Sequence, residues 1–468
     1  MPPWIASIIV SCGILGLFWL DRDRDAKPSP ALWIPIAWLA LACSRPISIW
    51  FDVGTSLSAD QVSEGSPVDR LVYLVLIVVG LVVVATRQRR VATLLRLNGP
   101  VVLFFAYCAV SLLWSDYPDV AVKRLFKAIG DLVMILIVLS EQQPLVAVQR
   151  VLARVAYVLI PVSILFIKYY IELGRGYGPW GGAAVYTGVT TNKNTLGVVC
   201  LFLGLAALWR FLRTYREPKS FNRKRHLLAQ CVVLAMTFWL LWVADSMTSL
   251  STFAMAGTLL FVTSRPSATR RPALVHFLIA TMLVASVSVL FLGASPTALN
   301  TLGRDPTLTD RTKIWAELLG LVTNPICGTG FESFWLGPRL EKMWSLYWWH
   351  PGQAHNGYLE IYLNLGWIGI ALLGFVIVKS YRAAFEAWRR DATLGNLVLA
   401  FFLSGLIYNF TEAAFFRMLH PAWIFFLSAI TAAPTIRGSV PVPTGTYMNV
   451  AISQTGEDQV STWQKQVV

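Results

Sequence analysis

Residues 69–86 read DRLVYLVLIVVGLVVVAT, with both charges in the first two positions and no charge behind them. A membrane-spanning helix needs about 20 predominantly apolar residues, because the hydrocarbon core offers no partner to exposed backbone groups. This stretch therefore predicts a transmembrane helix. Comparable apolar runs recur from Trp4 to Ala433, more than one water-soluble core could contain.

The overall composition leads to the same class of protein. The chain has 468 residues, of which 56% are hydrophobic and only 14% are charged, whereas soluble domains carry about 25% charged residues. A disordered chain, a secreted disulfide scaffold and a soluble nucleotide-binding enzyme are excluded. The six cysteines form neither a disulfide framework nor a zinc-binding spacing.

Thirteen segments are apolar enough to be predicted spans, although the fifth is interrupted by Lys127 and Asp131 and the ninth is short. They are residues 4–20, 31–51, 69–86, 99–114, 122–140, 152–170, 195–211, 227–244, 249–263, 273–292, 357–379, 396–410 and 420–434. We read Met1–Leu20 as a retained first span and not as a signal peptide, because no basic stretch precedes it. The predicted fold is an all-α polytopic integral membrane protein with about 12–13 transmembrane helices.

The distribution of basic residues predicts the orientation. The net charge is +14, and Lys and Arg concentrate in the loops that follow odd-numbered spans. The positive-inside rule places those loops in the cytoplasm and the N-terminus outside, and it explains the charge better than nucleic-acid binding does. The long loop 293–354 then faces outward. Residues 435–468 form a polar tail that we expect to be flexible.

The first of three unusual outward segments runs from Arg175 through a glycine-rich stretch to Thr190–Asn194, before the span 195–211. Free backbone N–H groups and the dipole at a helix start favour an anion, and Lys193 adds a full charge. A flexible turn that ends in an Asn or Thr cap is the structural alternative.

The second segment, residues 304–315, includes the run TLTDRTKIW at 307–315. An amphipathic helix is predicted to begin at Thr309 or Asp310 and to lie at the membrane surface. Arg311 could clamp a phosphate through its planar guanidinium group. The alternative is a helix face that is solvated or binds lipid headgroups.

The third segment, HPGQAHNGYLE at 350–360, leads into the span 357–379 and contains two of the five histidines. A neutral imidazole of His355 at an outward helix start could accept a proton; an interfacial cap is the alternative. No carboxylate cluster accompanies the histidines, so no metal site is predicted. Four tryptophans in the same loop could stack on sugars or lie at the membrane interface, namely Trp335, Trp344, Trp348 and Trp349.

Charged residues close to predicted spans give weaker hints. Arg124 and Lys127 follow residues 114–118, and Glu412 lies near the outer end of the twelfth span. Charges near the bilayer are costly, so they usually line a cavity or pair together.

Several pieces of these segments together resemble the superfamily of O-antigen ligases and Wzy-type polysaccharide polymerases. They are TNKNTLG at 191–197, SMTSL at 246–250, RTKIW at 311–315 with NPICGTGF at 324–331, and HNGYL at 355–359 with LGWIG at 365–369. Their order, spacing and predicted common side carry the resemblance, which covers about residues 100–430. Within the superfamily the chain looks most like exopolysaccharide polymerases of the succinoglycan type.

The resemblance implies a multi-pass glycosyltransferase of the bacterial inner membrane, related to C-type glycosyltransferases, with its active site on the periplasmic side. Such a polymerase joins oligosaccharide repeat units carried on undecaprenyl diphosphate, by inverting transfer without a metal or another cofactor. Its expected partners are the lipid-linked oligosaccharide and membrane lipids, with a chain-length regulator, a flippase and export proteins, but no nucleic acid.

The resemblance also implies roles for individual residues. Arg311 matches the family's essential loop arginine, and His355 matches its loop histidine, as catalytic base or as the group that orients the acceptor. The remaining candidates are Arg175, Lys193 and Arg124 for the diphosphate, with Arg311, and Asn192, Asn194, Trp315, Asn356 and Tyr358 for the sugars.

The implied division of the chain is N-terminal transmembrane helices at 1–98, an O-antigen ligase-like membrane domain at 99–434 and the polar tail. Two alternatives stay open. An O-antigen ligase or a protein O-oligosaccharyltransferase would share the donor but use another acceptor. A lipid-linked oligosaccharide flippase or transporter would place charged residues along a central pore.

Overall fold

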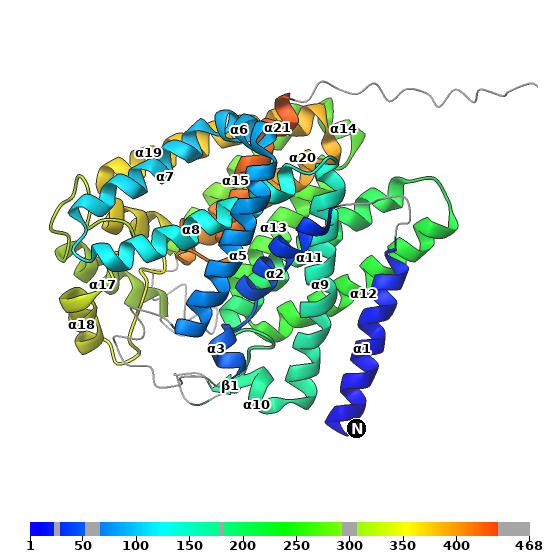
Figure 1. The fold of residues 1–468 in the computed structure, drawn as a ribbon, viewed down its shortest axis with the longest axis horizontal. Helices are drawn as coiled ribbons and strands as arrows, with labels where there is room; N and C mark the ends of the chain where they lie inside the picture. Colours follow the sequence, from blue (N-terminus) through cyan, green and yellow to red (C-terminus); the bar gives the residue numbers. More distant parts are fainter. Residues whose placement is uncertain (23–28, 52–65, 178–181, 183, 293–306, 439–468) are drawn as a thin grey trace, which may run out of the picture. The chain divides into compact units, whose positions relative to one another are not determined.

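The computed structural model describes residues 1–22, 29–51, 66–177, 182, 184–292 and 307–438. Helices make up almost all of its regular structure (Figure 1). The larger helices are α1 (Pro3–Leu20), α2 (Trp33–Ala42), α5 (Pro67–Thr86), α6 (Gln88–Leu97), α7 (Gly99–Val110), α8 (Pro118–Leu139), α9 (Pro144–Tyr169), α11 (Lys193–Arg216), α12 (Phe221–Ala244), α13 (Met247–Thr263), α15 (Pro272–Leu292), α17 (Thr307–Gly320), α18 (Gly337–Leu346), α19 (Gly357–Arg390), α20 (Ala392–Thr411) and α21 (Pro421–Gly438).

Short elements connect these helices. They are η1 (Pro30–Leu32), α3 (Ile47–Trp50), η2 (Ser111–Trp114), α10 (Ile171–Gly174), α14 (Pro266–Thr269) and the strands β1 (Arg175–Tyr177) and β2 (Ala184–Tyr186). The two strands pair antiparallel, with Arg175 opposite Tyr186. Residues Met1–Arg437 form one compact unit. The predicted tail 435–468 lies almost wholly outside the described residues.

The predicted all-α, multi-pass membrane fold is confirmed, and a helix lies at each of the thirteen predicted spans. Seven helices within the described ranges are individually long and apolar enough to cross a membrane: α1, α5, α9, α11, α12, α19 and α20. The bent pair of α6 with α7–η2, at 89°, could count as an eighth. The other segments are shorter or, in α8, interrupted by charges.

The predicted span 31–51 does not form one helix. Helix α2 ends at Ala42, and α3 begins after Pro46. Proline disfavours helical backbone in the residue before it, here Arg45, which explains the break.

Helix α19 is also interrupted, at Gly366, whose φ is 62°. The segment 325–330 lies against the break: Gly330 N donates to Asn364 O at 2.8 Å, and Trp367 N donates to Pro325 O at 2.9 Å. A helix break at membrane depth requires such protein partners for its freed backbone groups.

The segment from α17 to the start of α19 has a small core of its own. Ile314 and Leu318 of α17 pack with Phe334, Met343 and Leu363, and all five side chains are buried. This cluster is separate from the main core, which extends along the bundle from Leu17 to Ala433. The second cluster makes the loop a packed platform on which α17 and the start of α19 can hold side chains.

Helix segments close to the connections contact one another at two ends of the unit. At one end, Trp209 donates to Thr393 O at 2.6 Å and Trp388 donates to Thr263 O at 3.1 Å. At the other, the Thr248 and Thr411 hydroxyls lie 2.9 Å apart. Figure 1 shows α6 and α14 at the first end and α10 and β1 at the second. Contacts at the first end join helix segments that lie next to loops after odd-numbered predicted spans.

Candidate active site

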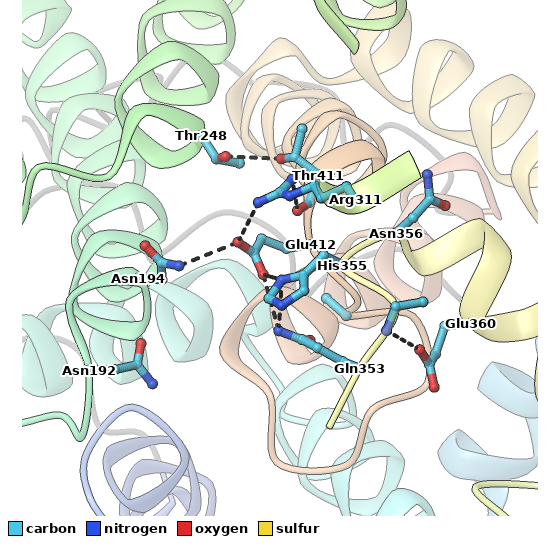
Figure 2. A network of polar contacts seen from close by, with 12 residues as sticks. Asn192, Asn194, Thr248, Arg311, Gln353, His355, Asn356, Glu360, Thr411 and Glu412 are labelled. Carbon is cyan, nitrogen blue, oxygen red and sulfur yellow. Dashed lines mark hydrogen bonds and ion pairs between the residues drawn. The ribbon is translucent and has the colours of Figure 1, made fainter. Parts of the chain in front are cut away.

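Glu412 is the centre of a polar network at the second end. It follows α20 directly, and its side chain is 8% exposed. Figure 2 shows side chains from several segments converging on its carboxylate. Because those segments are far apart in sequence, the site depends on how α11, α17, α19 and α20 pack.

His355 lies immediately before α19, with a left-handed φ of 50°. Its Nδ1 is 3.1 Å from Glu412 Oε2, and the same oxygen accepts from Gln353 Nε2 at 3.2 Å. A carboxylate beside Nδ1 favours the tautomer with the proton on that nitrogen. We therefore assign the lone pair to Nε2, which could accept a proton from a substrate.

Arg311 approaches Glu412 from the other side, on α17. Its Nη1 donates to Thr411 O at 2.8 Å, and its Nη2 is 3.9 Å from Glu412 Oε1. The predicted amphipathic helix exists and begins at Thr307, before the predicted Thr309 or Asp310. A second cation, Arg417, donates to Gln353 Oε1.

The start of α11 adds two asparagines. Asn194 Nδ2 is 3.4 Å from Glu412 Oε1, and Asn192 Oδ1 caps α11 by accepting from Thr195 N at 2.8 Å. Lys193 is turned towards solvent, 3.3 Å from Asp245. The segment 190–194 is thus a capped helix start, and its Asn194 reaches the Glu412 network.

The charge of this network is positive. Burial raises the pKa of Glu412, but the hydrogen bond with His355 and the positive charge of Arg311 bring it below the ordinary value of 4.5. One ionised carboxylate thus lies among two arginines. The excess positive charge and the free imidazole nitrogen suit an anionic leaving group beside a hydroxyl that loses a proton.

Two predicted diphosphate residues lie outside this network. Arg175 on β1 donates to Ile167 O at 3.0 Å and lies over the Tyr186 ring at 5.4 Å. Arg124 on α8 donates to Glu332 O and is 3.9 Å from the Glu332 carboxylate. Their predicted roles stay predictions, and only Arg311 of the four candidates contacts Glu412 directly.

Three predicted sugar-binding residues have structural partners. Asn356 Oδ1 caps α19 by accepting from Tyr358 N and Leu359 N at 3.0 Å. Tyr358 Oη donates to Leu406 O at 3.2 Å, and Trp315 Nε1 donates to Ala354 O at 2.8 Å. These contacts shape the segment around His355, and sugar binding by the three residues stays a prediction.

Sequence reasoning missed several residues that hold the site. Glu412 stood out only as a charge near a span, and Gln353 and Arg417 were not singled out. Arg45 holds the segment before α11 in place, because its Nη2 donates to Gly188 O at 3.1 Å and to Thr190 O at 3.0 Å. The available signal was charge close to an apolar span, which Arg45, Glu412 and Arg417 share.

No group of three His, Cys, Asp or Glu side chains within the described ranges is arranged to hold a metal ion.

Comparison with known proteins shows what part of the chain is similar to. Residues 181–374 match the sequence model of a family described as O-antigen ligase, so the predicted resemblance to the superfamily of O-antigen ligases and Wzy-type polymerases is confirmed. The matched residues include Asn194, Arg311 and His355, whereas Glu412 and Arg124 lie outside them.

A curated relative makes the likeness more specific. The chain is 24% identical over 293 residues to the "Exopolysaccharide production protein ExoQ" of Rhizobium meliloti (strain 1021). The alignment covers 59% of this chain and 63%, less than two thirds, of that protein. The chain is thus a multi-pass membrane protein that is similar to O-antigen ligases over residues 181–374 and, over 59% of its length, to an exopolysaccharide production protein.

Proposed function

We propose that this protein polymerises oligosaccharide repeat units carried on undecaprenyl diphosphate into an exopolysaccharide, by inverting, metal-independent transfer at the periplasmic face. One observation carries the proposal. Arg311 and His355, from two elements of the outer loop, both lie against the buried carboxylate of Glu412. This arrangement brings a cation and a proton acceptor to one place, as transfer from a lipid diphosphate requires.

The proposed step replaces the bond between the anomeric carbon and the diphosphate with a new glycosidic bond, and it moves one proton. An acceptor sugar hydroxyl attacks the anomeric carbon of the donor chain, and its proton moves to Nε2 of His355. The bond from the anomeric carbon to the diphosphate oxygen breaks, and undecaprenyl diphosphate leaves with the electron pair. Direct displacement inverts the anomeric carbon, and Arg311 stabilises the developing negative charge.

The arrangement of the helix connections supports the proposed side of the membrane. Trp209 and Thr393 lie towards the ends of α11 and α20 that lead to loops rich in Lys and Arg, whereas the Glu412 network contacts the opposite ends of the same two helices. By the positive-inside rule the basic end is cytoplasmic, which would leave the site facing outward.

An O-antigen ligase is the second candidate, because the matching family model is described by that activity. The two reactions share a donor and a leaving group and differ in the acceptor. Offering the reconstituted protein either a lipid-linked repeat unit or a lipid A core acceptor separates them, because a polymerase lengthens only the former.

Our first prediction concerns Arg311 and His355. With purified lipid-linked repeat units in proteoliposomes, the protein should produce a ladder of longer chains on a gel. Arg311→Ala should abolish the ladder because the leaving group loses its cation. His355→Ala should slow transfer by about 10²–10⁴-fold, the usual value of a general base, while donor binding persists.

Lys342→Ala provides the matched control, since Lys342 is an exposed cation of the same loop. It should leave the ladder unchanged. A normal ladder from Arg311→Ala would reject the diphosphate role. Loss of donor binding in His355→Ala would move His355 to the diphosphate site and leave the base unassigned.

A further inference from the structure

A buried carboxylate that the proposed chemistry does not use lies in α8. Asp131 is 0% exposed. Its Oδ1 accepts from Trp38 Nε1 at 2.9 Å, and its Oδ2 accepts from Leu419 N at 3.2 Å. One side chain thus joins α2, α8 and the loop between α20 and α21. Because a carboxylate buried among helices is costly, such a residue often has a structural or functional role.

The loop that Asp131 reaches, residues 412–420, carries part of the candidate active site. Its first half is held by Asn409, whose Oδ1 accepts from Ala414 N and Phe415 N, both at 2.9 Å. In its second half, Leu419 has a left-handed φ of 59°. Such a backbone is costly for leucine and persists only where its surroundings hold it. The bond to Asp131 provides such a constraint.

A short chain of contacts leads from Leu419 to the reactive groups. Arg417, two residues earlier, donates to Gln353 Oε1. Gln353 Nε2 donates to Glu412 Oε2 at 3.2 Å, the same oxygen that lies 3.1 Å from His355. A displacement of Leu419 would therefore be transmitted through Arg417 to the carboxylate beside the imidazole.

The partner of the other Asp131 oxygen is fixed by packing. Trp38 is 0% exposed and makes an edge contact with Tyr73 at 5.2 Å between ring centroids. Gly130 leaves room for its ring, since a Cβ there would lie 2.5 Å from Trp38 Cη2. A rigid donor on one oxygen keeps the other oxygen aimed at the loop.

We propose that Asp131 is a positioning residue: through the Leu419 amide it holds the half of the 412–420 loop that carries Arg417, and so keeps Gln353 and Glu412 in place beside His355. The inference rests on the proposed function for its kinetic consequence. Its structural part, the anchoring of the loop, can be measured without any activity.

The test starts with Asp131→Asn, which keeps the shape but offers one acceptor oxygen to two donors. In proteoliposomes with lipid-linked repeat units, we expect kcat to fall about 10-fold, the upper value for one lost hydrogen bond. In an Arg417→Gln background the further loss should be under about twofold, because contacts in one network are not additive.

Amide hydrogen exchange of residues 412–420 gives the second readout. Exchange there should become faster in Asp131→Asn, while α11 keeps its protection. Thr237→Val is the control, because this buried hydroxyl bonds only to Val233 O of its own helix among the contacts described. It should change neither kcat nor exchange in the loop.

The outcomes separate the two proposals. If wild-type protein makes no polymer but loop exchange rises in Asp131→Asn, the proposed function fails and the positioning role stands. The positioning role is overturned if Asp131→Asn leaves hydrogen exchange in the loop unchanged, or if it lowers kcat by the same factor in the wild-type and Arg417→Gln backgrounds. Should Asp131→Asn fail to fold, Trp38→Phe is the second variant, because it removes one donor to Asp131 and keeps an aromatic ring. Hydrogen exchange of the loop and kcat in the two backgrounds are then measured in the same way. We expect a smaller change in both than for Asp131→Asn.

Discussion

Glu412 shows what a single buried charge requires from its surroundings. A carboxylate withdrawn from water is stable only when hydrogen bonds and opposite charges replace its hydration. Here His355, Gln353 and Asn194 supply the hydrogen-bonding groups, and Arg311 supplies charge. Glu412 therefore orients the imidazole of His355 and partly neutralises the charge of Arg311.

The buried carboxylate of Glu412 should make the stability of the fold depend on pH. Since the folded pKa of Glu412 lies below its ordinary value of 4.5, ionised Glu412 stabilises the fold above that pH, and the contribution is lost as pH falls through the folded pKa. Glu412→Gln should therefore reduce the free energy of unfolding at pH 7 by about 1.5–3 kcal/mol and lower Tm accordingly. The Tm gap should shrink below about pH 4.5.

Thermal unfolding in detergent, followed by intrinsic fluorescence from pH 3.5 to 8, would measure this gap. Glu341→Gln on α18 is the control, because Glu341 is exposed, and its Tm should follow wild type throughout. A gap that widens on acidification would contradict the assigned charge state of Glu412.

At the scale of elements, the start of α19 is packed against the end of α20. A Cβ on Gly357 would lie 1.9 Å from Asn409 Oδ1. That oxygen accepts from two amides of the loop that carries Glu412. The glycine therefore lets two helices approach closely enough for His355 and Glu412 to meet.

Gly357→Ala should consequently damage both stability and transfer. Overpacking costs about 1–3 kcal/mol, and moving Asn409 would release the loop beside His355. Gly374→Ala tests the same substitution in the same helix where nothing lies within 4 Å, and it should be close to neutral. Tm and the rate of polymer growth would be measured for both; equal effects would refute the packing argument.

The unit of Met1–Arg437 has its connections at two ends, with the candidate site at one of them. Alternation of spans across a bilayer explains why contacts such as Trp209 with Thr393 and Thr248 with Thr411 join helix ends of the same predicted side. The orientation of the two ends relative to the cell is a prediction from charge.

Cysteine labelling can check that orientation in cells. In a cysteine-free background, Tyr177→Cys at the site end should react with a membrane-impermeant maleimide in intact spheroplasts, since Tyr177 is 82% exposed. Tyr215→Cys, from a 61% exposed position at the basic end, should react only after permeabilisation. The reverse pattern would place the candidate site in the cytoplasm.

Much of the fold followed from composition, because a span must satisfy its backbone internally and therefore needs a long apolar run. The run at 69–86 lies in α5, and residues 152–169 of the predicted span 152–170 lie in α9. The break after Ala42 and the bend between α6 and α7 were less visible. Local chain chemistry and packing decide such interruptions, and average hydropathy does not record them.

The sequence by itself determined the helices, the basic loops and the candidates Arg311 and His355, since each depends on residue type and local order. Only the tertiary structure decided that both meet at Glu412, which is 57 residues from His355 and 218 from Asn194. The same holds for Asp131 and Leu419, which are 288 residues apart. Such contacts depend on how whole helices pack, and no periodicity along one chain segment encodes them.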